Sequence, residues 1–360
     1  MAILLSGSTG WLGWPLTHGS APKPRSGEAV GARPAALDRP AQRTRTSSAS
    51  QNGEKPDPAG LTDAGAPASR VKSELPTTAV SQYLKTTRGA RLSNLGCRAA
   101  KLLSESKDDS AVSVLAFGRP LKRKGRWGAS LFGHGFRTIS QIQAGAQAYA
   151  QGYVNCWRKG PRLTVAIGTS NYGNRVSYAH GRAWALMVNG ANQWAGERGY
   201  VDRVEFAGAN DIELSWNGPR VSRAWVNGYD SVAEWPYYDF GDAAGCPPRG
   251  NCAGAWTPED VWYVSWGARA AWPLPQIYTP NGVMARQWYH LSLYSFVRHG
   301  WHMTIAGALS QHRACRQSSD PCRGMNNSPH RAWSQLNHLL NRDRRTAQRL
   351  PWLTDFGWGK

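Results

Sequence analysis

Residues 203–216 read RVEFAGANDIELSW, and this stretch decides the predicted fold. It begins as a strand, because apolar and charged residues alternate over 203–206. In an extended backbone, residues two apart face the same side, so Asp211 and Glu213 would present two carboxyls to one space while Ile212 turns away. The strand is therefore expected to end in a candidate acid/base pair.

Two neighbouring carboxyls have the chemistry that glycoside hydrolysis needs. One must stay protonated as the general acid, while the other is ionised as base, nucleophile or electrostatic support. The structural alternative is that Asp211 caps the following segment and Glu213 pairs with one of the many arginines.

Short apolar strands and amphipathic helices alternate on both sides of this stretch. The predicted strands lie at 112–117, 163–168, 203–216, 235–240, 274–278 and 303–309. Alternation of this kind is typical of a parallel sheet covered by helices, and over this length it best fits an α/β fold of the TIM-like (β/α) barrel type. Six strands are fewer than eight, so we expect an irregular or incomplete barrel, or two further strands within 81–110 or 243–272.

Composition divides the chain into four parts. Residues 1–80 are rich in Pro, Ala, Ser and Arg and offer little to bury, so they are predicted to be a leader and a disordered linker. Residues 81–110 contain a helical segment that is expected to pack on the barrel through Cys97. The barrel is predicted over 111–347, with a tail at 348–360.

A net charge of +20 favours anionic partners. The cations are mostly scattered singly, and no nucleic-acid-binding signature accompanies them, so no specific nucleic acid is expected. The one compact run, RPLKRKGR at 119–126, is expected to be a solvated loop or a polyanion contact. No stretch approaches the roughly 18 apolar residues of a membrane span, so no transmembrane helix is predicted.

The six cysteines suggest three disulfides. The predicted pairs are Cys246 with Cys252, Cys315 with Cys322, and Cys97 with Cys156. Neither close pair has the spacing of a zinc site, and disulfides indicate an oxidising compartment. We therefore expect a secreted or cell-wall-associated protein. Residues 1–16 fit a secretory signal only in part, because they are apolar but contain no Lys or Arg.

Active sites of such barrels lie at the carboxyl ends of the strands. The polar and aromatic residues predicted there are Arg119, Asn171, Tyr172, Trp216, Tyr238, Asp239, Gln276, Tyr278 and Gln311. Aromatic faces pack on the C–H side of sugar rings, while amides and carboxylates bond the hydroxyls. These residues are therefore predicted to bind a polysaccharide, with Asp239 as a further catalytic candidate.

The order of these strand ends resembles a known family. The segments are GTSNYG at 168–173, GANDIE at 208–213, YDFG at 238–241, PQIY at 275–278 and AGALSQ at 306–311. Over 111–345 they resemble the glycoside-hydrolase-like barrels of secreted bacterial proteins, and they are similar in plan to lysozyme-type muramidase barrels, whose catalytic Glu lies in a D-x-E. The resemblance implies that Glu213 is the general acid and that Asp211 orients or stabilises it.

One departure from that family bears on catalysis. Muramidase-type barrels carry an Asp at the end of the first strand, whereas the predicted first strand here ends in AFGR at 116–119. The sequence thus leaves three functions open: a hydrolase of bacterial cell-wall or extracellular polysaccharide, a non-catalytic glycan- or wall-binding barrel, and a polyanion-binding protein. We expect a monomer, no cofactor and no metal.

Overall fold

The computed structural model describes residues 74–247, 250–318, 322 and 324–359. The predicted leader and linker lies outside these residues as far as position 73. The strands are β1 Thr78–Tyr83, β2 Ser110–Ala116, β3 Arg119–Arg123, β4 Arg126–Leu131, β5 Gly135–Thr138, β6 Arg162–Ser170, β7 Val204–Asp211, β8 Tyr237–Asp239, β9 Ala271–Pro273, β10 Gly307–Ser310 and β11 Trp352–Trp358.

The helices alternate with these strands along the chain. They are α1 Gly89–Leu103, α2 Ile139–Cys156, α3 Tyr178–Glu197, α4 Pro219–Asp230, α5 Pro258–Trp262, α6 Val283–His299, α7 His312–Gln317 and α8 Pro329–Asn341, with a short π-helix at Tyr263–Gly267. Local sequence accounts for several helix starts. Thr138 forms a capping box with Gln141 at the start of α2, as the sequence predicts, and Thr257 caps α5 in the same way.

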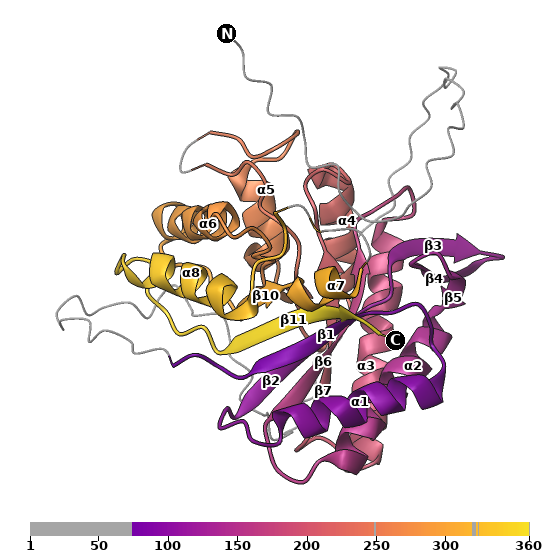
Figure 1. The fold of residues 1–360 in the computed structure, drawn as a ribbon. Helices are drawn as coiled ribbons and strands as arrows, with labels where there is room; N and C mark the ends of the chain where they lie inside the picture. The colour runs from indigo at the N-terminus through magenta and orange to yellow at the C-terminus, as the bar shows by residue number, and fades with distance from the viewer. Residues whose placement is uncertain (1–73, 248–249, 319–321, 323, 360) are drawn as a thin grey trace, which may run out of the picture. The chain divides into compact units, whose positions relative to one another are not determined.

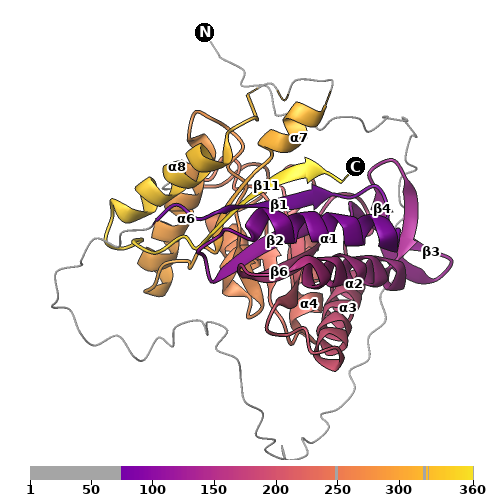
Figure 2. The same ribbon diagram turned by 60° about the horizontal axis from the view of Figure 1, so that its bottom comes forward.

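Eight strands of the described chain form one sheet in the order β10-β11-β1-β2-β6-β7-β8-β9. Every neighbouring pair is parallel, and helices cover the outside of the sheet (Figures 1 and 2). Ile277 N–H donates to the Leu309 carbonyl at 2.8 Å, and Leu309 N–H donates to the Pro275 carbonyl at 3.0 Å, so the two edges of the sheet meet. The fold is a nearly closed TIM-like (β/α) barrel, as predicted.

The strand count differs from the prediction at three places. β1, β9 and β11 were not among the six predicted strands, although β9 falls within the stretch that was left open at 243–272. The predicted strand at 274–278 is extended but contributes only an isolated bridge from Gln276 to Leu309. Pro275 lacks the N–H that a ladder requires, which interrupts regular pairing in this segment.

The barrel also extends beyond its predicted limits of 111–347. β1 pairs with β11 over six residues, from Thr78 with Leu353 to Tyr83 with Trp358. Figure 1 shows these two strands side by side. The segment predicted as a C-terminal tail is therefore a barrel strand, and the first strand of the barrel begins three residues before position 81.

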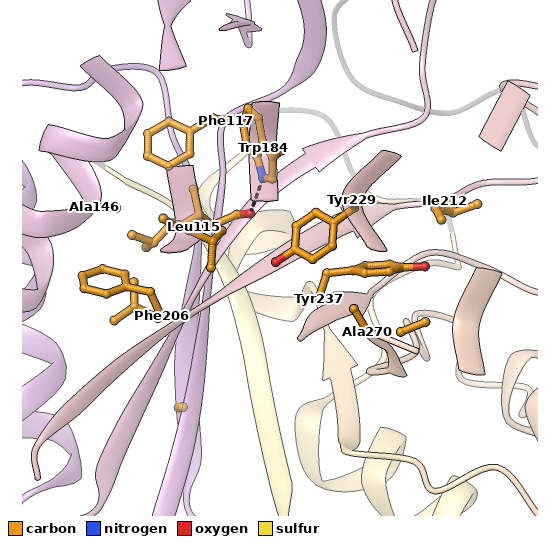
Figure 3. Close-up of a cluster of buried hydrophobic side chains, with 14 of the residues drawn as sticks. Leu115, Phe117, Ala146, Trp184, Phe206, Ile212, Tyr229, Tyr237 and Ala270 are labelled. Atoms are coloured by element: carbon orange, nitrogen blue, oxygen red, sulfur yellow. Dashed lines mark hydrogen bonds between the residues drawn. The ribbon is translucent and has the colours of Figure 1, made fainter. Parts of the chain in front are cut away.

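The core lies between the barrel strands and the surrounding helices. Figure 3 shows Leu115 of β2 and Phe117 near Trp184 of α3, all fully buried. The indole N–H of Trp184 donates to the Ile167 carbonyl at 2.9 Å, which satisfies its one donor inside the core. The hydroxyl of Tyr229 accepts from Gly208 N–H at 3.2 Å and links α4 to β7 in the same way.

Three disulfides join the cysteines as predicted. Cys97 of α1 is bonded to Cys156 of α2, Cys246 to Cys252, and Cys315 to Cys322. The first bridge joins α1, the helix within 81–110, to α2. Disulfides persist in oxidising compartments, so the three bridges are compatible with a secreted protein.

Candidate active site at the carboxyl end of the barrel

The sheet register brings several polar residues to one level of the barrel. Ser170 of β6 lies opposite Asp211 of β7, and Asn210 lies opposite Asp239 of β8. Since all these strands are parallel, their carboxyl ends open on the same side. The predicted acid/base pair therefore lies at the mouth of the barrel, next to Asp239.

Asn171 holds the backbone of Glu213 from the β6 side. Its side-chain oxygen accepts from Glu213 N–H at 3.1 Å, and its amide nitrogen donates to the Glu213 carbonyl at 3.0 Å and to the Ser222 hydroxyl at 3.1 Å. Asn171 is fully buried. Its amide is thus engaged within the protein, so we expect it to position Glu213 rather than to contact a ligand as the sequence suggested.

Asp242 holds the same segment from the β8 side. Its carboxylate accepts from Leu214 N–H at 3.0 Å, and its own N–H donates to the Ile212 carbonyl at 3.3 Å. The two segments pass so closely that a Cβ on Gly241 would lie 2.1 Å from the Ile212 oxygen. The D-x-E segment is therefore fixed from both neighbouring strands, which is the preorganisation that a catalytic group requires.

The carboxyl groups of the pair are almost closed to solvent. Asp211 is 6% exposed and Glu213 is 7% exposed, while Gln276, at 1%, donates its amide N–H to the Glu213 carboxylate at 3.2 Å. Oδ1 of Asp211 and Oε1 of Gln276 are buried and accept no hydrogen bond from the described part of the chain. Two acceptors thus remain for the hydroxyl or amide hydrogens of a bound molecule or for water.

Burial and mutual repulsion change the acidity of this pair. The pKa of Asp211 is well above its usual range, first because the side chain is buried and then because of the negative charges of Glu213, Asp239 and Asp242. Two carboxyls that repel each other titrate as a unit. The pair therefore holds a proton under conditions where two isolated carboxyls would hold none.

Asp239 is a third buried carboxyl beside the pair. Its two oxygens accept from Ser265 Oγ at 2.6 Å and from Gly241 N–H at 3.1 Å. Burial raises the pKa of Asp239 to about 7, although these hydrogen bonds oppose the shift. Burial also raises the pKa of Asp242 to about 6. The mouth is thus an acidic cluster that remains partly protonated near neutral pH.

Tyr83 is a site residue that the sequence analysis missed. Its hydroxyl lies 3.4 Å from the hydroxyl of Tyr278 and donates to Oε1 of Gln311 at 3.4 Å, and its ring stacks on Phe356 at a centroid distance of 4.1 Å. The pKa of Tyr83 is raised, first by burial and then by the charge of Asp211. The sequence did not reveal Tyr83 as a strand end, because its strand, TAVSQY, is short and partly polar.

The position of Tyr83 corrects the comparison with the muramidase barrels. The first strand of this barrel ends at Tyr83, whereas the 116–119 segment follows the second strand. The residue at the end of the first strand is accordingly a tyrosine, not an aspartate. A further carboxyl, Asp355 of β11, lies at the same end and accepts from Ser310 Oγ at 2.6 Å and from Arg313 N–H at 3.0 Å.

Three predicted binding residues form a row beside the D-x-E segment. The guanidinium of Arg119 lies 5.4 Å from the ring centroid of Tyr172, and that ring meets Trp216 edge-on at 5.5 Å. Trp216 N–H donates to the Glu213 carbonyl at 3.1 Å. Arg119, Tyr172 and Trp216 are half-buried, so part of each faces solvent. We call these three residues the rim row.

Two other predicted residues are buried deeper. Tyr278 and Gln311 both lie within hydrogen-bonding reach of the Tyr83 hydroxyl. The side-chain amide of Gln311 also donates to the Met325 carbonyl at 3.2 Å. Tyr238 does not join the mouth: its ring meets Trp352, the first residue of β11, at 5.4 Å. Because parallel strands run in one direction, Trp352 marks the opposite, amino end of the barrel, and Tyr238 points toward it.

A cavity of about 380 Å³ lies on the outer side of β1 and β11, separate from the mouth. Its lining comes from β1, α1, α7 and the end of β11, and consists of Val80, Gln82, Leu95, Arg98, Ala99, Leu102, Arg313, Gln317 and Trp358. None of the predicted catalytic residues contributes to it.

None of the protein-family models, curated proteins or solved structures compared with this chain matches it. Within residues 74–247, 250–318, 322 and 324–359, no three His, Cys, Asp or Glu side chains are grouped so that they could hold a metal ion. In the same residues no helix combines the length and the apolar character that crossing a membrane requires. The fold and the site together define a disulfide-bonded TIM-like barrel with a buried carboxyl cluster at its mouth.

Proposed function

We propose that this protein is a secreted glycoside hydrolase that acts on bacterial cell-wall or extracellular polysaccharide. The observation that carries the proposal is the Asp211–Glu213 pair, two residues apart at the carboxyl end of a barrel strand, with the pKa of Asp211 raised by burial and by the charge of Glu213. Such a pair contains a proton donor and an anion at the same time. Those are the two groups that cleavage of a glycosidic bond requires.

The neighbouring residues have supporting parts in this proposal. Gln276 orients the Glu213 carboxylate through its amide N–H, and Asn171 fixes the backbone of Glu213. Tyr83 and Tyr278 supply hydroxyls on the far side of the mouth. Tyr172 and Trp216 offer aromatic faces on which sugar rings can pack.

A non-catalytic glycan-binding barrel is the second candidate. Two observations favour it: the carboxyls of the pair are nearly closed to solvent, and a tyrosine stands at the end of the first strand. In that case the same rim row and mouth would hold a glycan without cleaving it.

Release of reducing ends from purified bacterial cell wall tests the proposal. The full chain, produced under oxidising conditions, is compared with Glu213→Gln, which keeps an oxygen for Gln276 but removes one of the two carboxyls. Glu234→Gln, at an exposed position, is the matched control. We expect release by the parent and the control, and a loss of about 100-fold or more in Glu213→Gln, the scale of removing a general acid or base.

Two other outcomes would reject hydrolysis. If no variant releases reducing ends but the parent and Glu213→Gln both sediment with the wall, the glycan-binding barrel is correct. If neither release nor binding occurs with wall or extracellular polysaccharide, both candidates are wrong.

A further inference from the structure

One long stretch of the chain contains only positive formal charge. Between Asp109 and Glu197 the chain contains no Asp or Glu, although this stretch builds β2 to β6 and the helices α2 and α3. Its cations are Arg119, Lys122, Arg123, Lys124, Arg126, Arg137, Arg158, Lys159, Arg162, Arg175 and Arg182. Asp211, the first carboxyl of the cluster, lies on the next strand, β7, so the cations that follow β2 adjoin an acidic mouth. Lys159 and Arg162 lie at the amino end of β6 and pair with carboxylates there.

The densest part of this surface is a structured hairpin rather than the solvated loop that the sequence suggested. β3 pairs with β4 in antiparallel register, with Arg123 opposite Arg126, and β5 completes a small sheet. Lys124 and Gly125 form the two-residue turn with φ of +47° and +76°, as a type I′ turn requires. All residues of 122–126 are exposed, so four cations cluster at the tip.

The turn itself points to a use for these cations. Gly or Asn occupies a left-handed turn position at least cost, whereas a Lys there is strained. Lys124 nevertheless occupies that position and adds a charge between Arg123 and Arg126. In both Figure 1 and Figure 2, β3 reaches past the neighbouring helices.

The hairpin is anchored firmly to the barrel at its base. Nδ1 of His180 accepts from the Trp225 indole at 2.9 Å, so the ring proton lies on Nε2, which donates to the Gly128 carbonyl of β4 at 3.1 Å. Burial lowers the pKa of His180 to about 4, so this neutral form persists at neutral pH. Trp127 packs edge-on against the same imidazole at 5.5 Å, which fixes the position of the basic tip.

The basic hairpin and the carboxyl cluster are connected along the surface. β3 starts at Arg119, the first member of the rim row, and the row continues through Tyr172 to Trp216 beside Glu213. Tyr178, 48% exposed at the start of α3, adds an aromatic face near the exposed Arg175. The cations of the tip and Arg119 are thus followed by the rings of Tyr172 and Trp216 toward the mouth.

We propose that this surface, from the hairpin tip through the rim row, binds an acidic polysaccharide whose chain then enters the mouth. The inference rests on the proposed function and specifies its substrate class as an anionic glycan. Arginines and lysines would pair with carboxylate, sulfate or phosphate groups on the glycan, while the rings pack on its sugar faces. Double-stranded nucleic acid fits less well, because its stacked bases leave no free faces for the aromatic rings of the rim row.

Binding of the full chain to polygalacturonate tests the surface independently of hydrolysis. The tip variant combines Arg123→Ser, Lys124→Asn and Arg126→Ser, with Asn chosen because it tolerates the positive φ of the turn. The control variant combines Lys101→Ser, Arg344→Ser and Arg349→Ser, which removes the same charge from exposed positions near the amino end of the barrel. Equal thermal unfolding of both variants and the parent establishes that the fold is intact.

We expect the tip variant to bind polygalacturonate about tenfold or more weakly than the parent, with a shallower dependence of Kd on salt, because fewer counterions are released. The Kd of the control variant for polygalacturonate should lie within about twofold of the parent value, since the charges it lacks lie away from the hairpin tip and the rim row. A neutral glucan should bind the tip variant and the parent equally.

Three results would overturn the inference. These are equal polygalacturonate binding by the tip variant and the parent, equal losses in the tip and control variants, and preferential binding of double-stranded DNA that the tip variant abolishes. Glu213→Gln separates the two proposals. If Glu213→Gln binds polygalacturonate like the parent while no variant hydrolyses any glycan, the proposed binding surface is supported and the proposed hydrolase is wrong. If the parent hydrolyses neutral glycan alone, the proposed hydrolase is supported and the proposed binding surface is wrong.

Discussion

Burial changes the acidity of individual carboxyl groups at the mouth of the barrel, and Asp239 is the clearest case. Asp239 is 1% exposed, and its hydrogen bonds from Ser265 and Gly241 do not offset the loss of water. Its pKa of about 7 therefore exceeds the ordinary value of 3.8. The folded protein holds a proton on Asp239 in the pH range where the unfolded chain has already released it.

The stability of the protein should accordingly fall as pH rises from about 4 to about 7, because the folded state binds more protons than the unfolded state in that window. Above about pH 7 this contribution levels off. In Asp239→Asn the loss of unfolding free energy between about pH 4 and about pH 7 should be smaller by a few kcal/mol, since each pKa unit corresponds to about 1.4 kcal/mol. Urea unfolding across this pH range measures it, with the exposed Asp202→Asn as control. Identical pH slopes for the parent and Asp239→Asn would show that Asp239 is not the group responsible.

Pairs of helices pack so closely that only glycine fits at their contacts. A Cβ on Gly181 of α3 would lie 2.0 Å from the Trp225 carbonyl of α4, and a Cβ on Gly228 of α4 would lie 2.0 Å from the Tyr178 carbonyl. The same arrangement joins α1 and α2 through Gly96 and Gly152. These contacts set the distance between neighbouring helices, and through His180 they also set the position of the hairpin.

Gly181→Ala should therefore destabilise the fold by about 2 kcal/mol or more, because the added methyl forces α3 and α4 apart. Gly196→Ala in the same helix meets no atom of the described residues within 4 Å. That control should instead stabilise by about 0.5–1 kcal/mol through helix propensity. Chemical unfolding of both variants gives the comparison, and equal stabilisation by the two substitutions would mean that the helices are not in close contact.

The whole barrel depends on a seam between strands that are far apart in sequence. β11 lies between β10 and β1, so the two ends of the described chain are adjacent strands. Phe356 of β11 is fully buried and stacks on Tyr83, which connects the seam to the mouth. Closure of the barrel and completion of the site therefore depend on the same strand.

A chain that ends at residue 347 lacks β11. It should no longer unfold cooperatively, because the edges of β1 and β10 are left unpaired and the ring of Tyr83 is exposed. Thermal unfolding followed by near-ultraviolet circular dichroism measures this. Phe356→Ala, which keeps the strand, should retain a cooperative transition and lose about 3–5 kcal/mol. A cooperative transition at the parent temperature in the shortened chain would contradict the role of β11.

The sequence by itself determined the features that depend on neighbouring residues. Alternating apolar strands and helices predicted the barrel, a capping box predicted the start of α2, and close cysteine spacing predicted two of the three bridges. The D-x-E spacing predicts that Asp211 and Glu213 face one space, because side chains alternate along an extended backbone. In the structure β7 ends at Asp211, and Glu213 follows two residues later.

Only the tertiary structure decided which short segments complete the barrel and what lies around the pair. β9 has three residues, and β1 and β11 contain polar residues within the strand, so their strand character comes from parallel pairing with distant segments and not from local pattern. The same pairing brings Tyr83 to the mouth, turns Tyr238 away from it, and engages Asn171 with the Glu213 backbone. These outcomes depend on contacts between residues far apart in sequence, which no local spacing encodes.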